Sequence, residues 1–314
     1  MRLRRSRLYV PGNNPKMIPP ASLYNSDVIS LDLEDSVAPD FKTDARMLVS
    51  EALKVLDFGP NVEVTVRINP LSTPFGKWDI RQIVCERLDG IYIPKVESRE
   101  DVIQVDEMVT DQEERKGLPI GKIKLFATLE TCKGIMNAYE IARCSKRLEA
   151  LTIGAEDLTA DLGGERTPDG LAINTARQIV VMAAKAAGIQ AIDTVYSDFA
   201  DMEGLRKETE MIKIMGYDGK AAIHPNQIEV IHSVFNPTPE QIRYAVKVQM
   251  AIEEAKKKGS GVIALGAKMI DRPVVLKAEK VLDIARAAEL HIPTPEEVIA
   301  SEPVKTKKSG GGDD

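Results

Sequence analysis

The feature that most constrains this chain is an alternation of short apolar, β-branched runs with longer segments of helical periodicity. Strands that alternate with helices in this way are typical of parallel βαβ units. The runs that read as strands are eight in number: residues 6–11, 27–34, 62–69, 88–96, 123–130, 150–157, 190–195 and 220–224. Eight such units predict an α/β fold that closes into a (β/α)8 TIM barrel. A doubly wound open sheet is the alternative, but no G-x-G-x-x-G motif follows the first strand to support a dinucleotide site.

The segments between these strands carry apolar residues at helical spacing, which predicts helices whose apolar faces pack on the core. One stripe consists of Phe41, Ala45, Leu48, Val49, Ala52, Leu53 and Leu56, and a second of Leu205, Thr209, Ile212 and Met215. The first connection differs, because Pro19 and Pro20 interrupt any helix there: proline lacks a backbone donor and clashes with the preceding turn. We expect that helix to be short or broken.

The alternation stops after the eighth unit, so we assign residues 1–236 to the catalytic barrel. The pattern of residues 237–292 predicts an appendage. It has a long amphipathic helix at 238–258, a glycine-rich stretch and a second helix at about 274–290. We interpret this appendage as a lid or an oligomerisation segment. Residues 293–314 end in KTKKSGGGDD, a stretch without apolar content, and we predict a disordered tail.

Composition excludes several classes of protein. No apolar run approaches the roughly 18 residues that span a bilayer, and the basic N-terminus lacks the apolar region of a secretory signal, so we expect no membrane association and a cytoplasmic location. A net charge of −6 gives no reason to expect a nucleic acid partner. The three cysteines, Cys85, Cys132 and Cys144, form no C-x-x-C pair and do not indicate a disulfide framework or a zinc site.

The expected strand ends are crowded with charge, and in a barrel these ends meet at one rim. The acidic residues are Asp32, Glu34, Asp35, Glu130, Glu156, Asp157 and Asp193, and the basic ones are Arg67, Lys95 and His224. So many carboxylates repel one another unless a cation neutralises them, and Mg²⁺ prefers a small number of carboxylates with retained waters. Any one of these residues alone reads more simply as a helix cap or a surface ion pair.

Glu130 and Asp157 end consecutive strands and are the pair best placed to hold such a metal ion. Glu34 and Asp35 could then accept hydrogen bonds from metal-bound waters. Gly154 and Ala155 are small, so their backbone N–H groups could approach a substrate carboxylate closely, next to Glu156.

Several longer motifs in the sequence resemble those of a known protein family. They are RRSRLYVPGNNPKM, LDLEDSVAPD, VRINPLSTPFGKWD, IYIPKVES, LETCKGIMNA, IGAEDLTADLGGERTPDG, AIDTVYSDFADMEG, DGKAAIHPNQI and GAKMIDRP. In this order and combination, from Arg5 to Leu290, the chain resembles the citrate lyase β-subunit family, within the HpcH/HpaI aldolase-like superfamily of citryl-, malyl- and citramalyl-thioester lyases.

The resemblance implies a TIM barrel in which Glu130 and Asp157 hold Mg²⁺, with Mn²⁺ as a substitute. It implies that Arg67 contacts the substrate and that Asp271, in the appendage, is the acid/base group. The substrate would be a thioester of coenzyme A or of the phosphopantetheine arm of an acyl carrier protein, cleaved to an acetyl thioester and a 2-oxoacid. A homotrimer or hexamer, and citrate lyase α and acyl-carrier subunits as partners, are further implications.

The carrier and the acid released stay open at this point. Arg4, Arg5 and Lys16 could receive the carrier's phosphates, but solvated surface charge explains each of them equally well. Different motifs favour citryl thioesters on the one hand and L-malyl-CoA or citramalyl-CoA, or the reverse malate-synthase-like condensation, on the other.

Three rival functions remain on the same barrel. A Schiff-base aldolase would need a lysine with a depressed pKa, and Lys95 and Lys220 both stand near strand ends. A glycosidase also uses two carboxylates, but the 4% aromatic content offers few platforms for sugars. A non-catalytic paralogue is disfavoured by the presence of Glu130, Asp157 and Asp271.

Overall fold

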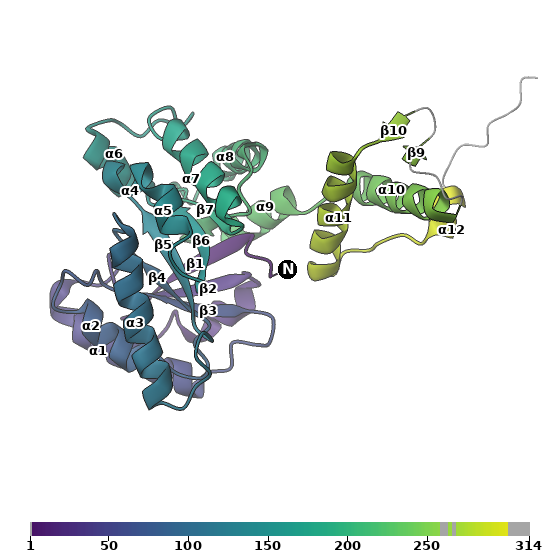
Figure 1. Cartoon of the computed structure of the whole chain (residues 1–314). Coiled ribbons are helices and arrows are strands. Elements are labelled where there is room, and N and C mark those ends of the chain that lie inside the picture. The colour runs from purple at the N-terminus through teal and green to yellow at the C-terminus, as the bar shows by residue number, and fades with distance from the viewer. Residues whose placement is uncertain (1, 258–262, 266–267, 301–314) are drawn as a thin grey trace, which may run out of the picture. The chain divides into compact units, whose positions relative to one another are not determined.

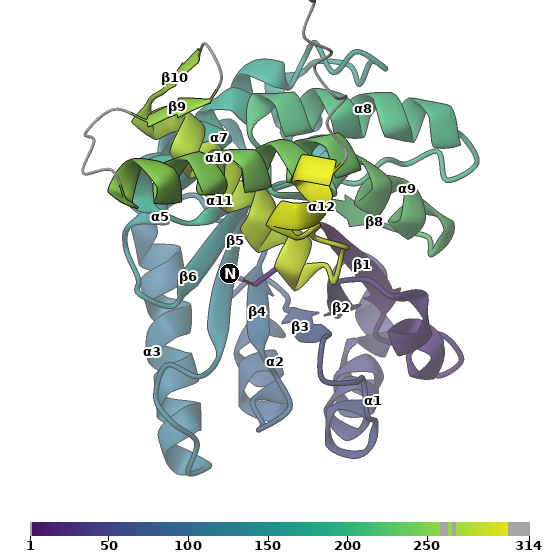
Figure 2. The ribbon, with the colours of Figure 1, turned by 90° about the vertical axis from the view of Figure 1, so that its right-hand side faces the viewer.

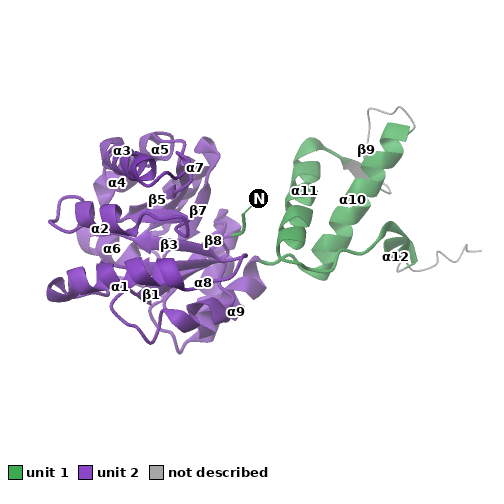
Figure 3. Ribbon diagram, turned by 90° about the horizontal axis from the view of Figure 1, so that it is seen from below, with its two compact units in different colours: residues 1–3, 236–314 green, residues 4–235 purple. Residues whose placement is uncertain are grey.

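The computed structural model describes residues 2–257, 263–265 and 268–300 of the chain. These residues form two compact units, which Figure 3 shows in different colours. One unit is Arg4–Phe235, and the other contains the rest of the described chain. The boundary falls next to residue 236, where the alternation of strands and helices in the sequence ends.

Parallel strands close into a barrel in the first unit, which confirms the predicted fold class. The strands are β1 Ser6–Pro11, β2 Val28–Asp32, β3 Glu63–Arg67, β4 Gly90–Ile93, β5 Lys124–Leu129, β6 Leu148–Ile153, β7 Gln190–Asp193 and β8 Gly219–Ala222. They pair in sequence order, and β1 closes the ring by pairing with β8 through Ser6, Arg7 and Leu8.

One strand differs from its expected bounds in a way that affects the site. We expected a strand over 150–157, but β6 ends at Ile153 and helix α6 begins at Ala155, with Gly154 as its N-cap. Asp157 therefore lies in the first turn of a helix and does not end a strand. The apolar period-2 pattern stops at Ile153, and Glu156 and Asp157 are favoured at a helix N-terminus by the helix dipole.

Helices surround the barrel strands, as Figures 1 and 2 show. They are η1 Pro19–Tyr24, η2 Pro39–Phe41, α1 Lys42–Val55, α2 Gly76–Ile83, α3 Arg99–Arg115, α4 Cys132–Met136, α5 Ala138–Ala142, α6 Ala155–Leu162, α7 Asn174–Ala187, α8 Met202–Met215 and α9 Asn226–Phe235. The first connection is the short 3₁₀ helix η1, as Pro19 and Pro20 predict. Among the described helices, none combines the length and the apolar character needed to cross a membrane.

The expected apolar stripes form the core between strands and helices. Ala45, Val49, Ala52 and Leu53 of α1 are buried, whereas Phe41 ends η2 and is exposed, so it does not belong to the stripe. In α8, Leu205, Thr209 and Ile212 are buried, as expected. A separate buried cluster takes one residue from each of five strands, which places it inside the ring: Val28, Tyr92, Phe126, Ala150 and Ile192.

The second unit has its own apolar core. The unit contains α10 Pro239–Lys257, α11 Arg272–Ala287, α12 Pro295–Ala300 and an antiparallel pair, β9 Ile263–Leu265 and β10 Lys268–Ile270. Helices α10 and α11 match the two helices expected in the appendage, and they pack side by side (Figure 3). A function of this unit as a lid or an oligomerisation segment stays a prediction.

Helix α12 corrects part of the disorder expected over residues 293–314. The backbone N–H of Thr294 donates to the Glu297 carboxylate at 2.7 Å, and the N–H of Glu297 donates to the Thr294 hydroxyl at 3.2 Å. This reciprocal capping box, together with Pro295 in the first turn and the burial of Val298 in the core of the unit, explains the helix. Residues 301–314 of the expected tail lie outside the described part of the chain.

His232 links the outer helix α9 to β1. Its Nε2 lies 2.7 Å from the Ser6 hydroxyl and 3.6 Å from a carboxylate oxygen of Asp27. Burial lowers the pKa of His232 to about 4, and the charge of Asp27 only partly opposes this effect. The folded protein therefore holds this imidazole neutral at a pH where the unfolded chain protonates it.

We predict that His232→Gln flattens the pH dependence of stability on the acid side. Because the folded pKa of His232 lies below the unfolded value of about 6.5, stability is lost as pH falls through this window. Between pH 7 and 4.5 the unfolding free energy of His232→Gln should fall by about 2 kcal/mol less than that of the wild type in urea titrations. The control is His291→Gln, an exposed site in the second unit. Equal slopes for wild type and His232→Gln would contradict the prediction.

Candidate active site

A pocket of about 420 Å³ opens among the C-terminal ends of the barrel strands, and all of its lining residues belong to the unit Arg4–Phe235. It contains most of the site residues expected from sequence. The polar lining is Arg7, Tyr9, Asp32, Asp35, Ser36, Arg67, Thr128, Glu130, Glu156, Asp157 and Thr194, and Gly154 and Ala155 form part of the wall. The barrel therefore assembles the predicted acidic rim at the end where TIM barrels carry their chemistry.

Glu130 follows β5 and is the more buried of the two expected metal ligands, with 4% of its surface exposed. One carboxylate oxygen accepts the backbone N–H of Lys95 at 2.6 Å. Its other oxygen packs against Gly154, where a side-chain Cβ would come within 2.4 Å of it. Burial raises the pKa of Glu130 to about 7, and the charge of Asp157 adds to this effect against the Lys95 N–H. A nearby cation would stabilise the ionised form.

Asp157 reaches the same pocket from the first turn of α6 and is 46% exposed. The Lys95 ammonium lies 3.2 Å from its carboxylate. Burial acts to lower the pKa of Lys95, but the hydrogen bond and charge of Asp157 outweigh it and raise that pKa. Lys95 is therefore a cation that partners the rim carboxylates. This protonated state does not suit a Schiff-base nucleophile.

The donor set of Glu130 and Asp157 fits Mg²⁺. That ion is commonly held by one or two carboxylates while water and substrate supply the other oxygens. The described residues hold no cluster of three or more His, Cys, Asp or Glu side chains placed to bind a metal. The desolvated carboxylate of Glu130 is the observation that most favours a cation at this position.

Arg67 ends β3 and is held by three carboxylates. Its guanidinium binds Asp32 through two N–H groups at 2.7 and 2.8 Å, and it lies 2.8 Å from Glu34 and 3.0 Å from Asp35. Burial alone would raise the pKa of Asp32, but the hydrogen bonds from Arg67 lower it. Burial raises the pKa of Glu34 to about 8 despite the charge of Arg67. Asp35 is 63% exposed and is the partner most easily exchanged for a ligand.

The expected substrate contacts from Gly154 and Ala155 need correction. The Gly154 N–H donates to the Leu129 carbonyl at 3.0 Å, and the Ala155 N–H donates to the Thr194 hydroxyl at 3.2 Å. Both groups are therefore engaged within the protein and do not point at a ligand. Gly154 instead provides room for the Glu130 carboxylate. The backbone N–H groups of Glu156 and Asp157 lie in the first turn of α6, where they have no partner within the helix.

Other expected site residues lie elsewhere in the structure. Arg4 and Arg5 precede β1, at the barrel end opposite the pocket, where Arg4 binds Glu63 at 2.8 Å and Arg5 binds Asp27 at 2.7 Å. Lys16 is exposed beside Met17, which lines the pocket. Asp271 belongs to the second unit, where its carboxylate caps α11 by accepting the N–H of Val274 at 3.3 Å.

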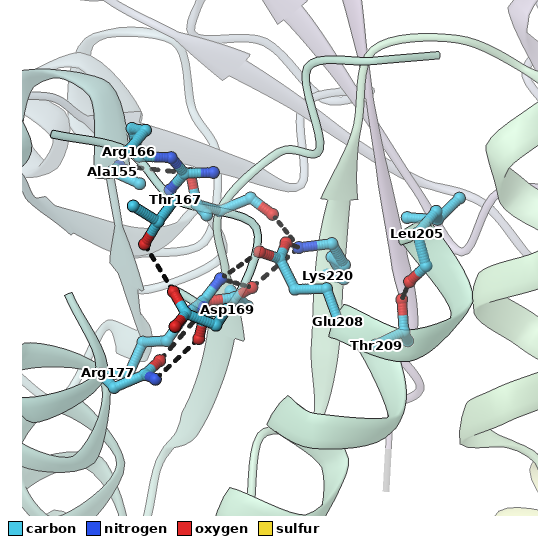
Figure 4. A network of polar contacts seen from close by, with 12 residues as sticks. Ala155, Arg166, Thr167, Asp169, Arg177, Leu205, Glu208, Thr209 and Lys220 are labelled. Atoms are coloured by element: carbon cyan, nitrogen blue, oxygen red, sulfur yellow. Dashed lines mark hydrogen bonds and ion pairs between the residues drawn. The ribbon is translucent and has the colours of Figure 1, made fainter. Parts of the chain in front are cut away.

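Asp193 was expected at the rim, but its side chain points away from the pocket into a buried ion-pair network. Its carboxylate accepts two hydrogen bonds from Arg177 at 2.9 Å and one from Lys220 at 2.8 Å. Glu208 completes the network, 2.6 Å from Lys220 and 3.1 Å from Arg177, and Figure 4 shows these contacts. Lys220 is consequently unavailable as an aldolase nucleophile. Side chains alternate along β7, so Thr194, the next residue, faces the pocket instead.

The network also positions the pocket wall. The Lys220 ammonium donates to the Thr194 carbonyl at 2.9 Å, while the Thr194 hydroxyl accepts the N–H of Ala155 at the start of α6. The two acidic and two basic side chains balance in charge, so each buried ionised group has a counter-charge, and removal of one partner would leave another unpaired.

Sequence reasoning missed Arg7 and Tyr9, which line the pocket from β1. A signal was present in the alternation of the strand. Leu8 and Val10 belong to the core between strands and helices, so residues 7, 9 and 11 must face inward. A charged residue at an inward position of a barrel strand is unusual and marks a candidate functional residue.

Comparisons with known proteins identify the family that the chain resembles. A family model described as HpcH/HpaI aldolase/citrate lyase matches residues 5–225. The chain is 45% identical to the citrate lyase subunit beta of Leuconostoc mesenteroides subsp. cremoris, over 92% of this chain and 95% of that protein. It is 36% identical to a (3S)-malyl-CoA thioesterase of Cereibacter sphaeroides, over 90% of this chain and 95% of that one.

A solved structure shares the fold. It is the CitE protein of Mycobacterium tuberculosis in complex with magnesium, acetoacetate and coenzyme A, with a TM-score of 0.71 and 30% identity. The match covers 90% of this chain and 98% of that one.

We predict that Lys220→Met lowers the unfolding free energy by about 3–5 kcal/mol, because it leaves buried carboxylates without their counter-charge. Urea titration monitored by circular dichroism measures the loss. The matched control is Lys207→Met, which removes an exposed i,i+4 pair with Glu203 and should cost about 0.5 kcal/mol or less. A loss for Lys220→Met no larger than that of the control would contradict this account of the network.

Proposed function

The chain belongs to the HpcH/HpaI aldolase/citrate lyase family, and we propose that it is a Mg²⁺-dependent lyase that cleaves a citryl-type thioester to oxaloacetate and an acetyl thioester. The observation that carries the proposal is the convergence of Glu130, Asp157 and Arg67 on one pocket. The chain is 45% identical to a citrate lyase beta subunit, and the match covers 92% of the chain. This similarity supports the choice of substrate class.

Glu130 and Asp157 are the residues that would hold the metal ion. A bound Mg²⁺ supplies Lewis-acid polarisation of the hydroxyl oxygen that becomes the carbonyl of the oxoacid product. The binding of magnesium and coenzyme A by the Mycobacterium tuberculosis relative supports both as ligands for this chain. Lys95, next to Asp157, balances the remaining negative charge of the rim.

Cleavage of the citryl thioester is a retro-Claisen reaction. The tertiary hydroxyl group would give its proton to Asp271, the bond between its carbon and the thioester methylene would break, and the electron pair would pass into the enolate of the acetyl thioester. Arg67 is the charged donor on the barrel that would stabilise the enolate oxygen. Asp271 would return a proton to the methylene carbon, which completes the acetyl group.

The carrier of the acyl group is coenzyme A or a phosphopantetheine arm in this proposal. Lys16 is the remaining candidate of the three expected phosphate contacts, because Arg4 and Arg5 are bound to carboxylates at the other end of the barrel. The proposal includes the citrate lyase α and acyl-carrier subunits as partners, since the beta subunit relatives are named as parts of citrate lyase.

A second candidate function has its own support. The similarity to a (3S)-malyl-CoA thioesterase favours a lyase or hydrolase for malyl-CoA or citramalyl-CoA in the same pocket. The two functions differ in the acid that is released and leave the roles of Glu130 and Asp157 unchanged.

The test of the proposal is cleavage by the purified full-length protein of citryl-CoA, citramalyl-CoA and malyl-CoA, each with and without Mg²⁺. We expect the highest kcat/KM for citryl-CoA, with oxaloacetate detected by coupled reduction with malate dehydrogenase. A higher kcat/KM for either of the other thioesters would replace the first function with the second. Absence of cleavage with all three would reject both.

We predict that Glu130→Gln, Asp157→Asn and treatment with EDTA each lower kcat by about 10³-fold or more, because Lewis-acid stabilisation contributes several kcal/mol. Re-addition of Mg²⁺ should restore the EDTA-treated wild type and leave the variants inactive. Isothermal titration with Mg²⁺ provides a readout that does not depend on turnover. The control is Glu140→Gln, a surface pair with Arg143. Wild-type activity in demonstrably metal-free protein would reject the metal site.

A further inference from the structure

Arg7 lies on the inward face of β1, beneath the pocket, with 2% of its surface exposed. Its guanidinium lies between two tyrosines, 4.3 Å from the ring centre of Tyr9 and 4.1 Å from that of Tyr92, and it donates a hydrogen bond to the Tyr9 hydroxyl. The Nε and Nη1 atoms are buried and have no hydrogen-bond partner among the described residues.

The charge of Arg7 also lacks a counter-ion within the described part of the chain. Other buried arginines are paired with carboxylates: Arg4 with Glu63, and Arg67 with Asp32. Arg7 instead contacts two neutral groups, the side chains of Tyr9 and Tyr92. Burial raises the pKa of Tyr92 to about 12, so this phenol stays neutral at physiological pH and supplies no negative charge. A desolvated cation without an anion is costly and favours an anionic ligand nearby.

Tyr9 connects this cation to the pocket. Its side chain is partly exposed and lines the pocket, and its ring lies between two guanidinium groups, 4.3 Å from that of Arg7 and 4.7 Å from that of Arg67. Because its hydroxyl oxygen accepts the hydrogen bond from Arg7, its own proton remains available for an acceptor in the pocket. Hydrogen bonding to a cation makes such a hydroxyl a stronger donor.

The second pocket cation, Arg67, differs from Arg7 because its charge is already paired with carboxyl groups of the protein. Its N–H groups already bind Asp32 and Asp35, and it also pairs with Glu34. Arg7 is therefore the lining cation whose charge the described carboxylates leave uncompensated. The pocket has an acidic rim that suits a divalent ion and, below it, a positive floor that suits an anion.

We propose that Tyr9 and Arg7 form a carboxylate subsite that selects the substrate by its released acid. Tyr9 donates its hydroxyl proton to the distal carboxylate of an oxaloacetate-forming thioester, and Arg7 neutralises that carboxylate from below and holds the Tyr9 ring in place. This inference rests on the proposed lyase function and adds to it the residues that distinguish a dicarboxylic from a monocarboxylic oxoacid. Tyr9 is a binding residue in this account, and Arg7 is a positioning residue.

Two substrates that differ only in the distal carboxylate test the role of this group. Citramalyl-CoA carries a methyl group where citryl-CoA carries a carboxymethyl group, and otherwise the two acyl groups match. We expect Tyr9→Phe and Arg7→Met to lower kcat/KM for citryl-CoA by about tenfold or more, the usual effect of losing a charge-assisted hydrogen bond, and to change citramalyl-CoA cleavage by less than about threefold. Arg7→Lys should retain part of the preference. An equal loss for both substrates, or no loss for citryl-CoA, would overturn the proposal.

Thermal stability separates this role from a structural one. Without ligand, Arg7→Met should melt at the wild-type temperature or above it, because the substitution removes a desolvated, unpaired cation. A purely structural role for Arg7 predicts a lower melting temperature, and that result would count against the subsite. The matched control is Arg81→Met, which removes a guanidinium 4.9 Å from the exposed ring of Trp78, outside the pocket, and should leave substrate preference unchanged.

Equilibrium binding distinguishes failure of this inference from failure of the proposed function. Isothermal titration in the presence of Mg²⁺ should show tighter binding of oxaloacetate than of pyruvate to the wild type, and loss of that preference in Arg7→Met. If the wild type cleaves no thioester but shows this preference, the lyase function fails and the subsite stands. If it cleaves citryl-CoA but binds both acids equally, the subsite fails and the function stands.

Discussion

Closure of the parallel barrel is the constraint on which the rest of this structure depends. Once β1 pairs with both β2 and β8, the side-chain alternation of every strand is fixed relative to the barrel axis. The consequence is clearest at two adjacent residues of one strand end. Asp193 faces outward and joins an ion-pair network, whereas Thr194 faces the pocket. A shift of one residue in the register would exchange these environments and bury an acid in the pocket wall.

Charge compensation then determines which residues are available for ligands. The outward network around Lys220 is neutral within itself, and Arg67 is surrounded by three carboxylates. Two buried charges in the same pocket remain without sufficient compensation from the described residues. Glu130 is a desolvated acid whose pKa is raised to about 7, so its ionised form needs a nearby cation, and Arg7 is a buried cation without a paired carboxylate among those residues. Because buried unpaired charge destabilises a fold, these are the two positions at which a ligand of opposite charge gains most.

The sequence predicted the barrel and part of the site, and the reasons for the difference are physical. Eight strands follow from local periodicity, and Glu130 follows from its place after a strand. Asp157 was correctly assigned to the pocket rim but wrongly to a strand end, because Gly154 begins a helix earlier than the acidic pair suggests. Arg4 could not be placed from sequence, since its partner Glu63 lies 59 residues away along the chain. The sequence also cannot show that Arg7 matters, because its role depends on the lack of a carboxylate partner among the described residues that surround it in the fold.

In the proposed complex, a metal ion near Glu130 and a carboxylate near Arg7 would influence each other's binding. A divalent ion bound near Glu130 adds positive charge to a pocket that already contains an uncompensated cation, so metal alone is bound against the field of Arg7. A carboxylate near Tyr9 adds negative charge under an acidic rim and is opposed by that rim. When both are present each neutralises the field that disfavours the other, and their binding free energies must favour each other by the same amount. If both proposed sites are occupied, the pocket should retain a metal ion and a dicarboxylate more strongly together than separately.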